Sequence, residues 1–261
     1  MQVLHNYNNS IRIIDQENQG AEIAKNSGVE KAIGDYLVFL DSDDVLFPSA
    51  LSLYYQIIET ENQPALVFAK GTGFNVKKGA PCFSFKKNIC SYSTYKDFFS
   101  KREPVWLSTS FLVLKHSLWN NSTKFKKGTF PADDLDFLLR IGTLGPCVII
   151  KEPATVAYRY HDNNSIKDTL RIIDKLNYLI EMEKNCEYGG GLKRKVDRLA
   201  LLGGHIIIWS FRGFKKRYYK KSLCFLLKGL PAVIAKIVIK LGNNMLQRYN
   251  GSKCENAKIV Y

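Results

Sequence analysis

Apolar runs and amphipathic stretches alternate along most of this chain. Continuous apolar runs predict strands over residues 36–40 and 65–69, a bent strand or strand pair over 105–115, an extended segment over 148–160 and a short strand over 10–14. Apolar positions at helical spacing predict helices over 21–33, 48–61, 133–141 and 166–185. Residues 71–104 show little periodicity and predict a loop with one short helix. Together these elements predict an α/β fold.

One stretch, GDYLVFLDSDD over residues 34–44, joins a strand to a group of carboxylates. Its apolar part predicts a strand buried on both faces, as in a parallel sheet, and such sheets bind ligands at the carboxyl ends of their strands. Asp41, Asp43 and Asp44 stand at that end, where a Mg²⁺ or Mn²⁺ ion would neutralise them and bind substrate phosphates. The alternative is turn and helix-cap chemistry, which aspartate also favours.

Three consecutive glycines, Gly189 to Gly191, mark a predicted boundary between a catalytic domain over 1–188 and a helical extension over 189–261. The extension holds 16 of the 38 Lys and Arg residues but only two of the 24 Asp and Glu residues, so it carries the whole net charge of +14. Basic helices with interleaved aromatic residues over 192–248 suit an anionic membrane surface. The alternative is a solvated helical face packed on the domain.

Several sequence features that mark other classes of protein are missing from this sequence. The six cysteines form no C-x-x-C pair and have no histidine at zinc-finger spacing, which is typical of reduced thiols in the cytosol. The first 14 residues are polar, unlike a signal peptide, and no apolar run approaches the roughly 18 residues of a membrane span. We do not favour nucleic acid as a partner, because the basic segment contains no recognised nucleic-acid motif. We expect a cytoplasmic protein that lies peripherally on the inner face of the membrane.

Three ordered blocks over residues 11–165 resemble the family 2 glycosyltransferases of the GT-A fold. They are Asn18-Gln19-Gly20 with Ala24-Lys25-Asn26-x-Gly28, Ala32-x-Gly34 and Phe39-Leu40-Asp41-Ser42-Asp43-Asp44; Asp133-Asp134-x-Asp136-Phe137-x-x-Arg140; and Tyr158-Arg159-x-His161. The resemblance implies a GT-A-type, mostly parallel sheet flanked by helices. It also implies an inverting transfer of a sugar from a nucleotide-diphosphate donor to a saccharide or lipid-linked acceptor, in bacterial polysaccharide or cell-surface glycan synthesis.

The same resemblance implies roles for individual residues. Asp43 would bind the Mg²⁺ or Mn²⁺ that bridges the donor phosphates, with Asp41 near the ribose or a metal-bound water. His161 matches a histidine that reaches the metal or the diphosphate. Asp134 matches the catalytic base, and Asp133 stands where the family usually has glutamate.

Further positions would contact the donor or support the site. Expected donor and diphosphate contacts are Lys25, Asp41, Gly128 and Arg159, and the supporting residues are Asp44 and Asp133. Simpler alternatives stay open at three places. The aspartates of residues 133–136 suit the first turn of a helix, His161 suits a solvated turn, and Lys25 suits an exposed helix position.

The start of the chain departs from the family pattern. Family members normally begin with a β-α-β unit of about 30 residues, whose acids hold the nucleobase and ribose, whereas about ten polar residues precede Ile11 here. We therefore expect a sheet that is truncated at its N-terminal side. The alternatives to a working transferase are a truncated, inactive relative and a basic membrane- or nucleic-acid-binding protein with an incidental D-x-D.

Overall fold

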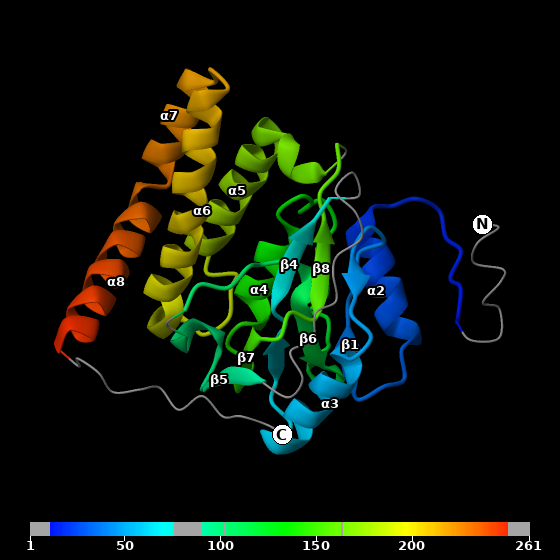
Figure 1. Ribbon diagram of the computed structural model, residues 1–261. Coiled ribbons are helices and arrows are strands. Elements are labelled where there is room, and N and C mark those ends of the chain that lie inside the picture. The colour runs from blue at the N-terminus through cyan, green and yellow to red at the C-terminus, as the bar shows by residue number, and fades with distance from the viewer. Residues whose placement is uncertain (1–10, 76–89, 102, 163, 250–261) are drawn as a thin grey trace.

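The computed structural model describes residues 11–75, 90–101, 103–162 and 164–249. Two β-sheets occupy the centre of the molecule, with α2 on one side of them and helices α5 to α8 gathered on the other (Figure 1). Strands and helices alternate along the chain up to α5, and only helices follow. The α/β class predicted from the sequence is therefore confirmed.

The larger sheet has five strands in the order β1-β6-β3-β7-β5. Their bounds are β1 (Tyr36–Val38), β3 (Leu66–Phe68), β5 (Ser91–Tyr95), β6 (Leu112–Lys115) and β7 (Cys147–Glu152). A smaller sheet has the order β2-β8-β4, with β2 (Val45–Leu46), β4 (Gly71–Phe74) and β8 (Val156–Arg159).

The expectation of a mostly parallel sheet is wrong for the described strands. Only β3–β7 and β4–β8 pair in parallel, and the other four pairings are antiparallel. The reason is β6, which lies between β1 and β3 and runs opposite to both. Strands β1, β3 and β7 still share one direction, so their carboxyl ends lie at the same edge of the sheet.

The long helices follow the predicted amphipathic stretches. They are α2 (Ala21–Lys31), α3 (Ala50–Thr60), α4 (Asp133–Ile141), α5 (Thr169–Lys184), α6 (Lys195–Lys215), α7 (Tyr219–Lys228) and α8 (Leu230–Tyr249). The predicted bounds of α2, α3, α4 and α5 agree within about three residues, and those of α4 agree at both ends. Short 3₁₀ turns include η2 (Phe98–Ser100), η3 (Thr109–Phe111), η4 (His116–Leu118), η5 (Ser165–Lys167) and η6 (Leu192–Arg194).

Two other predictions of secondary structure are wrong. Residues 11–14 form no strand, and their isoleucines stay partly exposed because no described strand lies beside them. The segment over 71–104 contains β4 and β5 as well as the expected short helix; residues 76–89 lie outside the described part. These strands were missed because GTGF and SYSTY contain no aliphatic side chains.

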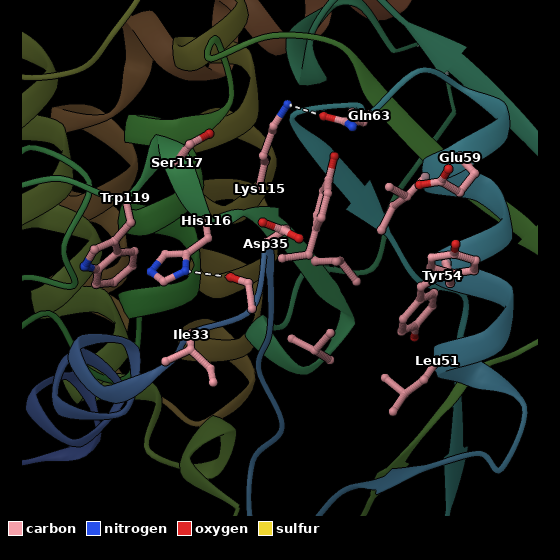
Figure 2. A pocket seen from close by; sticks show the side chains of 16 residues that line it. Ile33, Asp35, Leu51, Tyr54, Glu59, Gln63, Lys115, His116, Ser117 and Trp119 are labelled. Carbon is pink, nitrogen blue, oxygen red and sulfur yellow. Dashed lines mark hydrogen bonds between the residues drawn. The ribbon is translucent and has the colours of Figure 1, made fainter.

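Strand β1 is not buried on both faces as predicted. Leu37 and Phe39 are buried, whereas Val38 is 37% and Leu40 47% exposed. The cause is position, because β1 ends the order of the five-stranded sheet and pairs only with β6 among the described strands. A cavity of about 780 Å³ lies on this side, between α3 and the end of β6. Figure 2 shows the side chains that line it, including His116, whose ring Nδ1 lies 2.7 Å from the carbonyl oxygen of Gly34.

The C-terminal helices share a hydrophobic core with the sheet-bearing part of the chain. One cluster of buried residues combines Leu135 of α4, Ile173 of α5, Leu202 of α6, Phe225 of α7 and Ala232 of α8. The division at residue 189 stays a prediction. Within the described residues, no single helix is long and apolar enough to span a membrane; α7 and residues 230–242 of α8 meet that criterion only jointly, across a 67° bend.

Candidate active site

The end of β1 and the first turn of α4 meet around a single ammonium group. Lys25 Nζ, from α2, lies 3.2 Å from Asp41 Oδ1, 3.4 Å from Asp133 Oδ2 and 4.0 Å from Asp134 Oδ1. It also donates a hydrogen bond of 2.7 Å to Thr109 Oγ1. Four of the predicted site residues, from three segments of the chain, are therefore brought together. Lys25 is not the solvated helix residue of the simpler alternative.

The contacts around Lys25 shift the pKa values of the groups that take part in them. Burial alone would lower the pKa of Lys25, but Asp134, Asp41 and Asp133 together raise it. Burial raises the pKa of Asp133, against the opposing effect of Lys25. Burial and then the neighbouring Asp133 raise the pKa of Asp134 to about 7. Asp134 therefore exchanges its proton near neutral pH.

A second contact joins Asp43 to the loop after β8. His161 Nε2 lies 2.7 Å from Asp43 Oδ2, and each side chain is about a third exposed. The backbone N–H of His161 donates to Asn164 Oδ1 at 2.6 Å, which holds the loop in place. The first and third sequence blocks, 118 residues apart, thus meet in space.

Asp44, which was predicted to support the site, makes a structural contact between two strands. It is buried, and its Oδ1 accepts a hydrogen bond of 3.2 Å from the backbone N–H of Arg159. This bond ties the start of β2 to the end of β8. The carboxylates of the site line a second cavity, the main cavity described below, and neither Asp44 nor Arg159 is among its lining residues. The predicted donor contact of Arg159 therefore has no counterpart in that lining.

Gly128 lies in a loop that is fixed to α2. The backbone N–H groups of Gly128 and Phe130 both donate to Glu22 Oε1, at 3.1 and 2.9 Å. Gly128 has a φ of +83°, a conformation that glycine adopts without strain. Sequence reasoning missed the role of buried Glu22, whose only signal was an acidic residue in the first turn of a helix. Gly128 itself does not line the cavity.

The carboxylates open onto a cavity of about 1100 Å³. Part of its wall consists of Lys25, Asp41, Asp43, Asp133 and Asp134. The loop over 104–108 and helices α6 and α8 form another part, which includes Trp106, His205, Trp209 and Lys236. The sequence did not reveal this second part, because it depends on how distant helices pack.

The residues at this site could supply only some of the ligands of a metal ion. Within the described ranges, no group of three His, Cys, Asp or Glu side chains is arranged to hold a cation. Asp43 and His161 form an adjacent pair, while Asp41 is ion-paired with Lys25. Mg²⁺ is commonly held by one or two carboxylates and completed by substrate phosphates and water. The pair therefore fits a divalent cation that arrives with a diphosphate.

Comparison with known proteins finds a family match in the N-terminal part of the chain. The model of the family described as "Glycosyl transferase family 2" matches residues 1–118. Residues 1–118 are similar to glycosyl transferase family 2. This family 2 segment contains Lys25, Asp41 and Asp43 and ends before Asp133, Asp134 and His161.

Relatives of this chain include a chondroitin synthase and a hyaluronan synthase. The chain is 27% identical to the chondroitin synthase of Escherichia coli over 157 residues, which is 60% of this chain and 22% of the relative. It is 25% identical to the hyaluronan synthase of Pasteurella multocida over 187 residues, 72% of this chain and 18% of the relative. The chain thus spans about a fifth of each synthase.

Among solved structures, S. aureus TarS 1–349 in complex with UDP aligns with a TM-score of 0.47 and 16% identity, over 78% of this chain and 66% of that one. The predicted resemblance to family 2 glycosyltransferases is confirmed by the family match. A further relative is named as a glycosyltransferase, GlyG of Streptococcus pneumoniae, which is 31% identical over 34% of this chain and 27% of the relative.

Proposed function

We propose that this protein transfers a sugar from a nucleotide-diphosphate donor to a saccharide or lipid-linked acceptor, with inversion and with the help of Mg²⁺ or Mn²⁺. The observation that carries the proposal is that two separated carboxylate-bearing segments, with Asp41 and Asp43 in one and Asp133 and Asp134 in the other, meet at one cavity. Lys25 joins Asp41 to Asp133 and Asp134, and His161 joins the loop after β8 to Asp43. Synthesis of a bacterial polysaccharide agrees with the synthases among the relatives.

Asp134 acts as the general base in this proposal. The acceptor hydroxyl oxygen attacks the anomeric carbon of the donor sugar while its proton passes to Asp134. The bond between that carbon and the diphosphate oxygen breaks, and the electron pair leaves with the nucleoside diphosphate. A single attack from the opposite face inverts the anomeric centre. A pKa near 7 suits this role, because a base works best when its pKa lies near the working pH.

Asp43 and His161 would hold the divalent cation, whose chemistry is to neutralise the charge that develops on the leaving diphosphate. Lys25 supplies a second positive charge at the same place, and Asp41 lies near the ribose or a metal-bound water. Contacts of Gly128 and Arg159 with the donor stay predictions.

We also propose that helices α7 and α8 rest on the anionic inner face of the membrane. Large apolar side chains are exposed among the lysines of these helices, including Leu227, Ile234 and Val238. Apolar side chains that enter the interface and lysines that face anionic lipids both favour such binding. A membrane position would suit a lipid-linked acceptor.

Thermal unfolding of the 261-residue chain with UDP or GDP, each with and without Mn²⁺, tests the donor site. A nucleotide at 100 times its Kd stabilises the fold by about 2.7 kcal/mol, which raises the Tm of a chain of this size by several degrees. We expect a Mn²⁺-dependent rise that is lost in Asp43→Ala and kept in Asp134→Ala.

Asp162→Ala is the matched control, because Asp162 is a highly exposed carboxylate in the same loop as His161. It should keep the full response. If no nucleotide raises the Tm under any condition, the chain has no working donor site. A relative without catalysis, or a basic membrane-binding protein, would then replace the transferase proposal.

A further inference from the structure

The cavity that contains the carboxylates also contains a separate group of cations. Lys101, Arg212, Lys236 and Lys240 line it, from the end of η2 and from helices α6 and α8. Within the described part of the chain, none of these four forms an ion pair with a carboxylate. Lys25, by contrast, is surrounded by three aspartates. Opposite charges therefore line different parts of one cavity.

A close helix crossing places the cations of α8 at the cavity. A Cβ added to Gly203 of α6 would overlap the backbone oxygen of Ala232 in α8, so the two helices touch through their backbones there. One turn further along α8, the side chain of Lys236 lies beside Gly204. Gly203 therefore allows α8 to approach closely enough for its lysines to line the cavity.

Nearby carboxylates of the protein compensate the positive charge in this part of the cavity only in part. Burial and then the nearby Lys236 lower the pKa of Lys101, and the weaker effects of Glu103 and Asp197 do not reverse this. Burial and then Lys236 lower the pKa of His205 to about 4, so this histidine is neutral at pH 7. An anion bound between Lys101 and Lys236 would offset the repulsion between them.

Apolar side chains accompany the cations. Ile208 of α6 and Ile237 of α8 line the cavity and are 51% and 49% exposed. The guanidinium group of Arg212 lies 4.4 Å from the ring centre of Trp209, which also lines the cavity. A small inorganic anion would contact only the cations. An anionic group on a hydrocarbon chain would contact both the cations and the apolar side chains.

We propose that this part of the cavity binds the linking phosphate of a lipid-linked saccharide, with Lys101 and Lys236 on the phosphate and the hydrocarbon chain along Ile208 and Ile237. The saccharide then extends towards Asp134, so that its hydroxyl meets the base. The inference rests on the proposed function in one respect, namely that the bound molecule is the sugar acceptor.

Binding of decyl phosphate to the 261-residue chain tests the site without any turnover. We would titrate below the micelle concentration, in a phosphate-free buffer with EDTA, and follow heat or the fluorescence of the cavity tryptophans. Lys236→Met and Lys101→Met should each weaken binding about tenfold, the loss expected when a charged hydrogen-bond partner is removed. Lys220→Met removes the same charge from exposed α7, outside the cavity lining, and should leave the Kd within about twofold.

Two further ligands distinguish the sources of the phosphate. Decanol lacks the charge and inorganic phosphate lacks the chain, so each should bind at least about tenfold more weakly than decyl phosphate. Inorganic phosphate binding as tightly as decyl phosphate would overturn the lipid assignment in favour of a simple anion site. Unchanged binding in Lys236→Met, or equal weakening in Lys220→Met, would overturn the site itself.

The nucleotide experiment separates this inference from the proposed function. Lys236→Met should keep the Mn²⁺-dependent response to nucleotide, because Lys236 contacts none of the carboxylates around Lys25. Nucleotide binding without decyl phosphate binding would overturn the acceptor site and leave the transferase standing. Decyl phosphate binding at Lys236 in a chain that binds no nucleotide would support the phosphate site and overturn its assignment to an acceptor.

Discussion

The two charged parts of the main cavity are built in opposite ways. Around Lys25 the acidic groups are brought together by a cation of the protein, with nitrogen-to-oxygen distances of 3.2 to 4.0 Å. Around Lys236 the basic groups have no carboxylate partner in the described residues and are mostly exposed. The acidic part is therefore preorganised before any ligand arrives, whereas the basic part gains its partner only from a ligand.

This difference assigns separate tasks to the two parts. A preorganised carboxylate group suits chemistry, because a base must already lie within about 3 Å of the proton that it removes. Exposed lysines and apolar side chains suit recognition of a flexible, charged chain end. Variants of the acidic part should therefore change turnover, and variants of the basic part should change which acceptors bind.

The largest effect is expected at Asp134. Asp134→Asn should lower turnover by about 10²- to 10⁴-fold, because an amide cannot take the acceptor proton. Nucleotide binding should remain, as measured by the Mn²⁺-dependent rise in Tm. Asp162→Asn in the exposed loop serves as the control. Turnover within tenfold of the original chain would show that Asp134 is not the base.

A second variant separates the cation from the base. Asp43→Asn should weaken nucleotide binding in Mn²⁺ by about a hundredfold, the upper range for losses of metal affinity when residues around a metal site are replaced. EDTA should reduce nucleotide binding by the original chain in the same way and should have little further effect on the variant. Calorimetric titration with and without Mn²⁺ measures both. A variant that still responds to Mn²⁺ as the original chain does would exclude Asp43 as a ligand.

Lys25→Met would break the preorganisation of the acidic part. Lys25 now lowers the pKa of Asp134, so its removal raises that pKa further above the value of an ordinary aspartate. The base must be deprotonated to act, so the rise of kcat/KM with pH should move to higher pH. A displacement of one pH unit would lower activity tenfold on the acidic limb. Lys25→Arg retains the charge and should keep the profile nearer its original position; a profile that moves to lower pH contradicts the arrangement.

The smallest effect concerns the membrane surface. Leu227→Ser on α7 should lower partitioning into anionic vesicles about fivefold, since burial of a leucine side chain contributes about 1.5–3 kcal/mol when complete and less when partial. Leu51→Ser on α3 is the matched control, because the two leucines are 60% and 55% exposed. Vesicle sedimentation measures the difference. Equal losses in the two variants would contradict a specific role of α7.

The sequence predicted the chemistry of the acidic part better than its geometry. The bounds of α4 and the candidates Asp133 and Asp134 followed from local periodicity and from the ordered blocks. The contacts of Lys25 did not, because they join residues up to 109 positions apart. The exposed face of β1 was also missed, since an apolar run does not reveal whether its strand ends a sheet.

For the basic part of the cavity, the sequence predicted an excess of positive charge but not its position in the fold. The excess of lysine and arginine after residue 189 indicated an anionic partner, but not that some of these cations line the same cavity as Asp43. That arrangement depends on the packing of α6 against α8, which local propensity does not encode. Gly203 carried the signal, because a small residue on a helix allows the backbone of another helix to approach closely.

The backbone contact between Gly203 and Ala232 makes the cavity a promising scaffold for engineering. Because main-chain atoms set the spacing of α6 and α8 at this crossing, it does not depend on the long side chains that face the cavity. Lys236 and Lys240 could therefore be exchanged for neutral or acidic residues without moving α8, the helix that carries them. A library confined to these positions would explore uncharged or cationic acceptors while the donor half of the enzyme stays as it is.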